Sequence, residues 1–128
     1  MVGLVIVSHS WKIAEGVRDL AQQMAPDYNG IRCAGGLEDG EIGTDAIRIL
    51  EAIRDADEGD GVALLVDLGS GILSAETAIE LLDGELPARI ADTPIVEGAI
   101  VAAVEASAGA SLDEVIQAAE DIRGDYKL

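Results

Sequence analysis

His9, the single histidine of this 128-residue chain, is the residue best suited to chemistry at neutral pH. It follows a short apolar segment, Val2–Val7, and stands between Ser8 and Ser10. Imidazole is the side chain that ordinarily titrates near neutrality, and its unprotonated nitrogen is a nucleophile. A lone histidine is more often structural than catalytic. Its position between two serines, directly after an apolar segment, nevertheless favours a functional role.

An acidic residue and a glycine-rich turn could complete a site around this histidine. Asp67 stands near the end of the apolar segment Gly61–Leu68, and Gly69-Ser70-Gly71 follows it. A carboxylate that accepts the N–H of one ring nitrogen fixes the tautomer and leaves the other nitrogen free to attack. Backbone N–H groups of the turn, with the Ser70 hydroxyl, could hold phosphoryl oxygens. A phosphohistidine site needs these parts, although Asp67 could also be a capping residue and the glycines plain turn residues.

Other kinds of site find little support in the sequence. One histidine and one cysteine cannot build a zinc site. No G-x-S-x-G, G-x-G-x-x-G or Walker A pattern is present, so neither a serine hydrolase nor a nucleotide site is expected. Cys33 is interpreted as a small core residue.

The elements that must position these residues alternate between strands and helices. We expect strands at 2–7, 31–34, 61–68 and 89–91, and helices at 11–24, 44–56, 72–82, 96–107 and 111–122. This alternation predicts an α/β fold, an open and mostly parallel sheet with helices on both faces. Because the carboxyl ends of parallel strands share one edge, the loops at Ser8-His9-Ser10, Gly35-Gly36 and Asp67–Gly71 are expected to meet there.

The spacing of apolar residues predicts which face of each helix is buried. The expected stripes are Ile13, Val17, Leu20 and Met24 in the first helix, Ile47, Leu50 and Ile53 in the second, and Ile72, Ala75, Ile79 and Leu82 in the third. Thr44 is expected to cap the second helix, and Ser111 with Glu114 forms a capping box before the last one.

Composition indicates one domain over residues 1–128, without nucleic-acid or membrane partners. Twenty-five acidic residues against eight basic ones give a formal charge of −17, which repels nucleic acid. The acids are spread along the chain, and lysine is scarce, which favours a salt-loving host over a specific basic partner. No apolar stretch approaches the ~20 residues of a membrane helix, and a single cysteine fits a reducing cytoplasm. We therefore expect a cytoplasmic location.

Four segments resemble, in the same order, the EIIA-like domain of the DhaM family, the phosphotransferase subunits of phosphoenolpyruvate-dependent dihydroxyacetone kinases. They are GLVIVSHSWKIAEGVRDLAQQM, AGG…IGTDAIRILEAI, VALLVDLGSGILSAETAIELL and PIVEGAIVAAVEASAGASLDEV. The resemblance runs from Val2 to about Ala119 and is most specific in VSHS, in DLGS before LSAETA, and in PIVEGA. More distantly, the chain is similar to the mannose-type EIIA domains of the sugar phosphotransferase system.

The resemblance implies a defined relay. His9 would accept a phosphoryl group from phospho-HPr at Nε2 and deliver it to ADP held on the subunit DhaL, so that ATP phosphorylates dihydroxyacetone on DhaK. Asp67 matches the carboxylate that bonds the histidine in mannose-type relatives. No permanently bound cofactor is implied, only the covalent phosphoryl group, and the expected assembly is a homodimer. Some members continue into HPr-like and enzyme-I-like domains, so a chain ending here is expected to use separate general phosphotransferase proteins.

The expected site residues fall into two sets. Those expected around the phosphoryl group are Ser8, Ser10, Gly35, Gly69, Ser70 and Gly71. Trp11 and Ile13 are expected partner contacts, because high salt screens charge complementarity and leaves docking to apolar side chains.

Two alternative functions remain open from the sequence. A mannose-type EIIA of a sugar permease is disfavoured by DLGS with LSAETA, where the sugar relatives tend to carry a Trp-Gly-Gly-rich loop. A non-catalytic regulatory module would keep the fold but would not need a free imidazole nitrogen.

Overall fold

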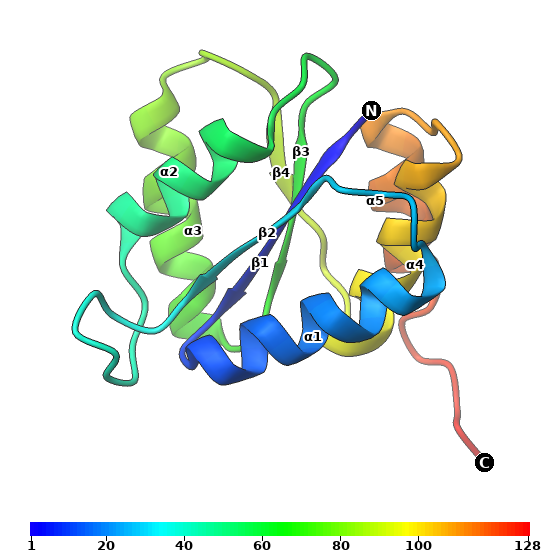
Figure 1. Ribbon diagram of the computed structural model, residues 1–128, viewed down its shortest axis with the longest axis horizontal. Coiled ribbons are helices and arrows are strands. Elements are labelled where there is room, and N and C mark those ends of the chain that lie inside the picture. The colour runs from blue at the N-terminus through cyan, green and yellow to red at the C-terminus, as the bar shows by residue number, and fades with distance from the viewer.

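A computed structural model describes residues 1–128 as strands and helices in alternation (Figure 1). The strands are β1 (Gly3–Ser8), β2 (Ile31–Gly35), β3 (Val62–Val66) and β4 (Ala88–Ile90). The helices are α1 (Trp11–Met24), α2 (Ala46–Ala56), α3 (Gly69–Leu82), α4 (Ile95–Ser107) and α5 (Leu112–Asp121). All nine expected elements exist, with bounds that differ at several ends, most at β3 and at the start of α3. None of the helices is both long enough and apolar enough to cross a lipid bilayer.

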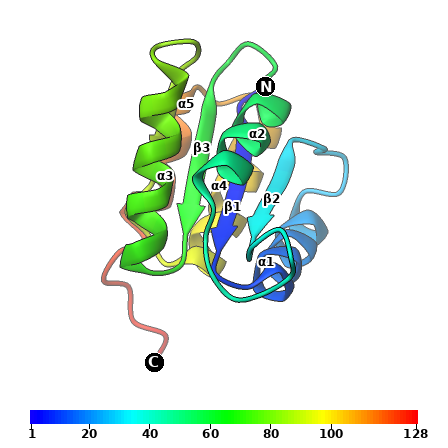
Figure 2. The same cartoon turned by 90° about the vertical axis from the view of Figure 1, so that its left-hand side faces the viewer.

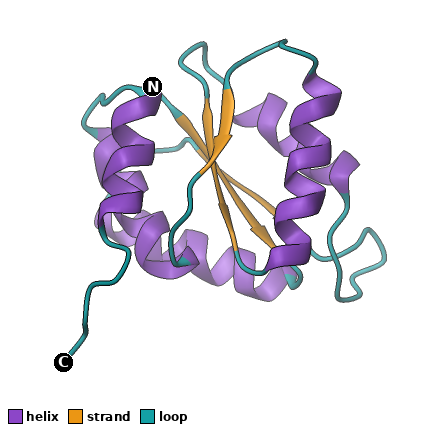
Figure 3. Cartoon of the chain, turned by 180° about the vertical axis from the view of Figure 1, so that it is seen from behind, coloured by secondary structure: helices purple, strands orange, loops and turns teal.

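The four strands form one parallel sheet in the order β2-β1-β3-β4. Helices α1, α4 and α5 cover one face, and α2 and α3 cover the other (Figures 1 and 3). The arrowheads of β1, β2 and β3 point to the same edge, where α1 and α3 begin (Figure 2). The prediction of an open parallel α/β sheet with helices on both faces is therefore confirmed.

Two apolar cores lie on opposite faces of the sheet, because successive side chains of a strand point to opposite sides. Leu4 and Ile6 of β1 belong to the core under α1, α4 and α5, whereas Val5 and Val7 belong to the core under α2 and α3. Every residue of β1 and β3 is buried, as expected for continuous apolar strands in a parallel sheet. The first core is closed by small side chains of α4: Ala99, Ala102, Ala103 and Ala106.

The prediction of which α1 residues are buried is wrong except at Val17. The helix buries Ala14, Val17 and Ala21, while Ile13, Leu20 and Met24 are exposed. Alanine faces allow the helix to approach the sheet and α4 closely, which leaves the larger aliphatic side chains at the solvent-facing flank.

The starts of α2 and α3 also differ from expectation. Asp45, not Thr44, caps α2: its carboxylate accepts hydrogen bonds from the backbone N–H groups of Ile47 and Arg48. Helix α3 begins at Gly69, so Gly69-Ser70-Gly71 is its first turn and not a separate turn before it. The first buried residue of α3 is Gly71.

The remaining predictions about the helices are partly confirmed and partly wrong. Ile47 and Ile72 are exposed, against expectation, whereas Leu50, Ile53, Ala75 and Leu82 are buried as expected. Ile79 packs against the second core while half-buried. The capping box of Ser111 and Glu114 at α5 is confirmed.

Candidate active site

The site lies at the edge of the sheet where β1 and β3 end side by side. Val7 of β1 pairs with Val66 of β3, so the residues that follow, His9 and Asp67, meet although 58 positions separate them. On the other side of β1, Ser8 pairs with Gly35 of β2. The parallel arrangement thus brings together all three loops that the sequence indicated.

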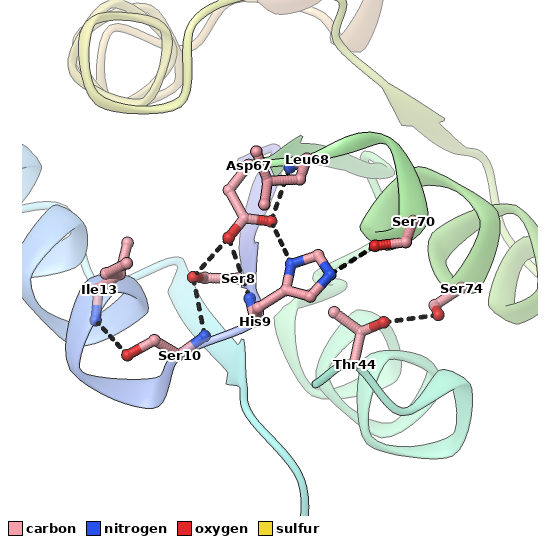
Figure 4. Close-up of polar contacts among 9 residues, drawn as sticks. All are labelled: Ser8, His9, Ser10, Ile13, Thr44, Asp67, Leu68, Ser70 and Ser74. Atoms are coloured by element: carbon pink, nitrogen blue, oxygen red, sulfur yellow. Dashed lines mark hydrogen bonds and ion pairs between the residues drawn. The ribbon is translucent and has the colours of Figure 1, made fainter. Parts of the chain in front are cut away.

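The His9 ring is held by Asp67 through Nδ1, which lies 3.0 Å from Asp67 Oδ1 (Figure 4). The side chains of His9 and Asp67 are only 19% and 12% exposed. With the proton on Nδ1, the ring donates to the carboxylate and Nε2 keeps its lone pair. The geometry therefore directs one defined nitrogen, Nε2, outward.

The Asp67 carboxylate is itself fixed by three further donors. The Ser8 hydroxyl donates to Oδ2 at 2.8 Å, the His9 backbone N–H donates to Oδ2 at 3.0 Å, and the Leu68 N–H donates to Oδ1 at 2.7 Å. Burial would raise the pKa of Asp67, but these hydrogen bonds and the one from the His9 ring outweigh it and lower that pKa below its ordinary value. Asp67 is thus a rigid and ionised acceptor for the ring at neutral pH.

The first turn of α3 faces the other ring nitrogen. Ser70 Oγ lies 2.6 Å from His9 Nε2 (Figure 4). Leu68 occupies the N-cap position and provides no side-chain cap, and the N–H groups of Gly69 and Ser70 have no acceptor within the protein. Unpaired N–H groups at a helix start carry partial positive charge and attract anions. Two backbone donors and one hydroxyl are therefore available beside Nε2.

Gly71 lets α3 begin close to the end of β3 and to Asp67. A Cβ atom at Gly71 would come within 2.9 Å of Val66 Cγ1 and within 3.5 Å of His9 Cε1. A Cβ atom at Gly69, in the same turn, would meet nothing within 4 Å. Close packing therefore requires glycine at Gly71 but not at Gly69.

The other residues expected near the phosphoryl group have structural contacts. The Ser8 hydroxyl accepts the Ser10 N–H besides donating to Asp67, and the Ser10 hydroxyl caps α1 by accepting the Ile13 N–H. A Cβ atom at Gly35 would lie 2.5 Å from the Trp11 Cα, so this glycine allows α1 to start against β2. These three positions shape the loop that carries His9, and their contact with a phosphoryl group stays a prediction.

Exposed apolar side chains occur near the starts of α1 and α3, the two helices that begin at the site. Trp11 and Ile13, in the first turn of α1, are 46% and 49% exposed. Sequence reasoning missed Leu68 and Leu73, which flank the start of α3 and are 62% and 66% exposed. Leu68 directly follows Asp67. It stands at the N-cap position of α3 although its side chain makes no capping hydrogen bond, and no other feature marks it.

Sequence reasoning also missed a hydroxyl pair next to Ser70. Thr44 Oγ1 lies 2.7 Å from Ser74 Oγ (Figure 4). The available signal was the Thr-Asp pair before α2, in which Asp45 can cap the helix and leave the Thr44 side chain for another contact.

No group of three or more His, Cys, Asp or Glu side chains is placed to hold a metal ion. Burial raises the pKa of Cys33 to about 11, and its thiol lies 3.4 Å from the Ala14 carbonyl oxygen, which supports its interpretation as a packing residue.

The chain is similar in sequence to components of the phosphotransferase system. The family model EIIA-man, described as the fructose IIA component of the phosphotransferase system, matches residues 3–116. The Escherichia coli phosphoryl donor subunit DhaM of phosphoenolpyruvate-dependent dihydroxyacetone kinase is 48% identical over 121 residues, which cover 91% of this chain and 26% of that protein. A Listeria innocua DhaM subunit is 42% identical and is covered over 95% of its length, against 91% of this chain.

The chain thus spans about a quarter of the length of the Escherichia coli relative and nearly all of the Listeria one. Among solved structures, a protein of unknown function has a TM-score of 0.80 and 31% identity, over 94% of this chain and 95% of its own.

Proposed function

This chain belongs to the EIIA-man family of phosphotransferase-system IIA components, and we propose that it is a phosphohistidine carrier. In this proposal it is the phosphoryl donor subunit of a phosphoenolpyruvate-dependent dihydroxyacetone kinase, as its relatives from Escherichia coli and Listeria innocua are named. One observation carries the proposal: Asp67 holds His9 by Nδ1, so that Nε2 faces the uncapped start of α3.

In the accepting step, the lone pair of His9 Nε2 attacks the phosphorus atom of phospho-HPr. The bond between phosphorus and the donor breaks, and its electron pair stays with the donor. The His9 ring then carries the phosphoryl group on Nε2 and a proton on Nδ1, so it bears a positive charge. Asp67, 3.0 Å from Nδ1, stabilises that charge without taking the proton.

In the donating step, a terminal oxygen of ADP, held on DhaL, attacks the same phosphorus atom. The bond from phosphorus to Nε2 breaks, its electrons return to the ring, and ATP is formed. The His9 ring is neutral again, with its proton still on Nδ1. Since Asp67 keeps the same contact throughout, the site needs no proton transfer between the two steps.

The donors for the phosphoryl oxygens in this proposal are all uncharged. They are the N–H groups of Gly69 and Ser70 and the Ser70 hydroxyl, which turns from Nε2 to a phosphoryl oxygen. No lysine or arginine makes a hydrogen bond or ion pair with His9, Asp67 or Ser70. Neutral donors stabilise the phosphoryl group less than cations would, which keeps its transfer favourable.

Docking in this proposal uses the exposed apolar side chains beside His9, with Trp11 and Ile13 as contacts for HPr and for DhaL. Both follow His9 within four residues and are about half-exposed. The homodimer stays a prediction; the outer edge of β4, a strand of three residues at the border of the sheet, is a candidate contact. Sedimentation of the purified chain tests the predicted homodimer separately.

The test of the proposal is stepwise phosphoryl transfer with purified components. The chain is incubated with phosphoenolpyruvate, enzyme I and HPr, and its intact mass is measured. We expect one phosphoryl adduct that is labile to acid, stable to alkali and lost in His9→Ala. Adding DhaL with ADP should then discharge the adduct and form ATP. An adduct that a sugar permease discharges and DhaL does not would favour a sugar EIIA, and no adduct would favour a regulatory binding module.

A further inference from the structure

Thr44 is a polar residue beside His9 to which the relay above gives no role. Its Oγ1 lies 2.7 Å from Ser74 Oγ, and both residues are half-buried. In Figure 4 the Thr44–Ser74 pair and Ser70 lie on the side of the His9 ring that carries Nε2. Ser70 Oγ contacts Nε2 itself, and the Thr44 hydroxyl points toward Ser74 on the same helix as Ser70.

The backbone fixes Thr44 at this place. The N–H of Gly43, the preceding residue, donates to the His9 carbonyl oxygen at 2.9 Å. The following residue, Asp45, caps α2 with its carboxylate. The cap function is therefore already filled, and the Thr44 hydroxyl makes no hydrogen bond to α2.

Helix α3 connects Thr44 to the serine that contacts the reactive nitrogen. Ser74 is four residues after Ser70, so the two serines are neighbours on one face of α3, with Cβ atoms about 5–6 Å apart. Ser70 contacts Nε2 and Ser74 contacts Thr44. Thr44 is thus held against the same helical face that presents Ser70 to His9.

We propose that Thr44 supplies a fourth hydrogen-bond donor to the phosphoryl group on His9. When Nε2 is phosphorylated, the Thr44 O–H donates to a terminal phosphoryl oxygen, and the Ser74 O–H donates to Thr44 Oγ1. A hydroxyl has one donor and two acceptor positions, so Thr44 can make both bonds at once. This inference rests on the proposed function and assigns Thr44 as a binding residue, with Ser74 as its positioning residue.

The charge of the phosphoryl group and its number of oxygens favour a further hydrogen-bond donor. A phosphoryl group has three terminal oxygens and close to two negative charges at neutral pH. The start of α3 provides two N–H groups and the Ser70 hydroxyl, with no cation in contact with these residues. Hydrogen bonds to a charged group are stronger than neutral ones, so a further hydroxyl has a measurable effect.

The experiment uses a small-molecule phosphoryl couple, so that it depends on no partner protein. N-phosphoimidazole transfers its phosphoryl group to His9 Nε2 and releases imidazole, and the equilibrium constant is measured by phosphorus NMR from both directions. The variants are Thr44→Val, Thr44→Ser and Ser74→Ala. Thr77→Val is the matched control, because Thr77 is exposed on α3 and its hydroxyl donates only to the Leu73 carbonyl of its own helix.

We expect Thr44→Val to lower the equilibrium constant about tenfold, Ser74→Ala to lower it less, and Thr44→Ser and Thr77→Val to stay within about twofold of the wild type. A wild-type value in Thr44→Val, or an equal loss in Thr44→Ser, would overturn the role of Thr44. If HPr does not phosphorylate the wild type but N-phosphoimidazole does, the proposed phosphoryl donor is wrong. The equilibrium constants of the variants with N-phosphoimidazole then still decide the role of Thr44. A wild type that phosphoimidazole does not phosphorylate contradicts both.

Discussion

The buried Ser8 hydroxyl donates to Asp67 Oδ2 at 2.8 Å, while the His9 ring contacts Oδ1 of the same carboxylate. Ser8 is the one fully buried polar side chain of the protein. Its hydroxyl also accepts the N–H of Ser10, and it therefore links the end of β1, the start of α1 and the residue that orients the histidine. The alignment of His9 is thus built on a short chain of hydrogen bonds behind the ring.

Ser8→Ala is expected to destabilise the protein by about 1–2 kcal/mol, because the Ser10 N–H and Asp67 Oδ2 each lose a buried partner. The free energy of unfolding from urea titration measures this change. Ser107→Ala is the control, since the exposed Ser107 hydroxyl donates only to Val104 of its own helix, and it should change stability by less than about 0.5 kcal/mol. Equal effects of the two substitutions would contradict this account of Ser8.

Asp67→Asn is expected to reveal a stability contribution that depends on pH. The pKa of Asp67 is lower in the folded protein than in the unfolded chain, so the charged form favours the folded state. This contribution is fully present above the unfolded-state pKa of about 3.9 and is lost as the pH falls through the folded-state value. The difference in unfolding free energy between wild type and variant should therefore shrink on acidification. A difference that stays constant or grows toward low pH would show that Asp67 is not stabilised as an anion.

Gly71→Ala and Gly69→Ala make the same chemical change within one turn of α3 and should behave oppositely. At Gly71 the new methyl group would lie 2.9 Å from Val66 Cγ1 and 3.3 Å from Asp67 Oδ1. Because it would displace the carboxylate that orients His9, phosphorylation of His9 should slow about tenfold. At Gly69 the methyl group meets open space, and the variant should be as active as the wild type and no less stable, because alanine favours the helix. The rate of adduct formation measures both, and a slow Gly69→Ala variant with a fast Gly71→Ala variant would refute the packing argument.

Trp11→Ala should slow phosphoryl transfer from phospho-HPr about tenfold while leaving the fold intact. Phosphorylation by N-phosphoimidazole should be unchanged, because that donor needs no docking surface. Leu81→Ala is the control. Leu81 is as exposed as Trp11, but it lies at the C-terminal end of α3, whereas the site lies at the N-terminal end of this helix. An unchanged rate from phospho-HPr in Trp11→Ala would remove Trp11 from the docking surface.

The strands and the meeting of His9 with Asp67 were predictable, and the buried face of α1 was not. Continuous apolar segments such as Val2–Val7 indicate strands buried on both faces, and parallel strands bring their carboxyl ends to one edge. The buried face of α1 is made of Ala14 and Ala21, whose small side chains give a weak apolar signal beside Ile13 and Leu20. Counting large aliphatic residues therefore selected the wrong face.

The hydroxyl pair of Thr44 and Ser74 could not be predicted for a different reason. Threonine and aspartate are both good caps, so the sequence does not distinguish Thr44 from Asp45 as the first residue of α2. The partner of Thr44 depends on how α2 and α3 pack on the same face of the sheet, which no local pattern specifies.

In the proposed relay, Asp67 holds Nδ1 and leaves Nε2 of His9 as the nucleophile. Nitrogen NMR of the phosphorylated protein, with its histidine labelled in both ring nitrogens, tests this most directly. We expect the phosphoryl group on Nε2 and a proton on Nδ1. A phosphoryl group on Nδ1, or on any residue other than His9, would contradict the account.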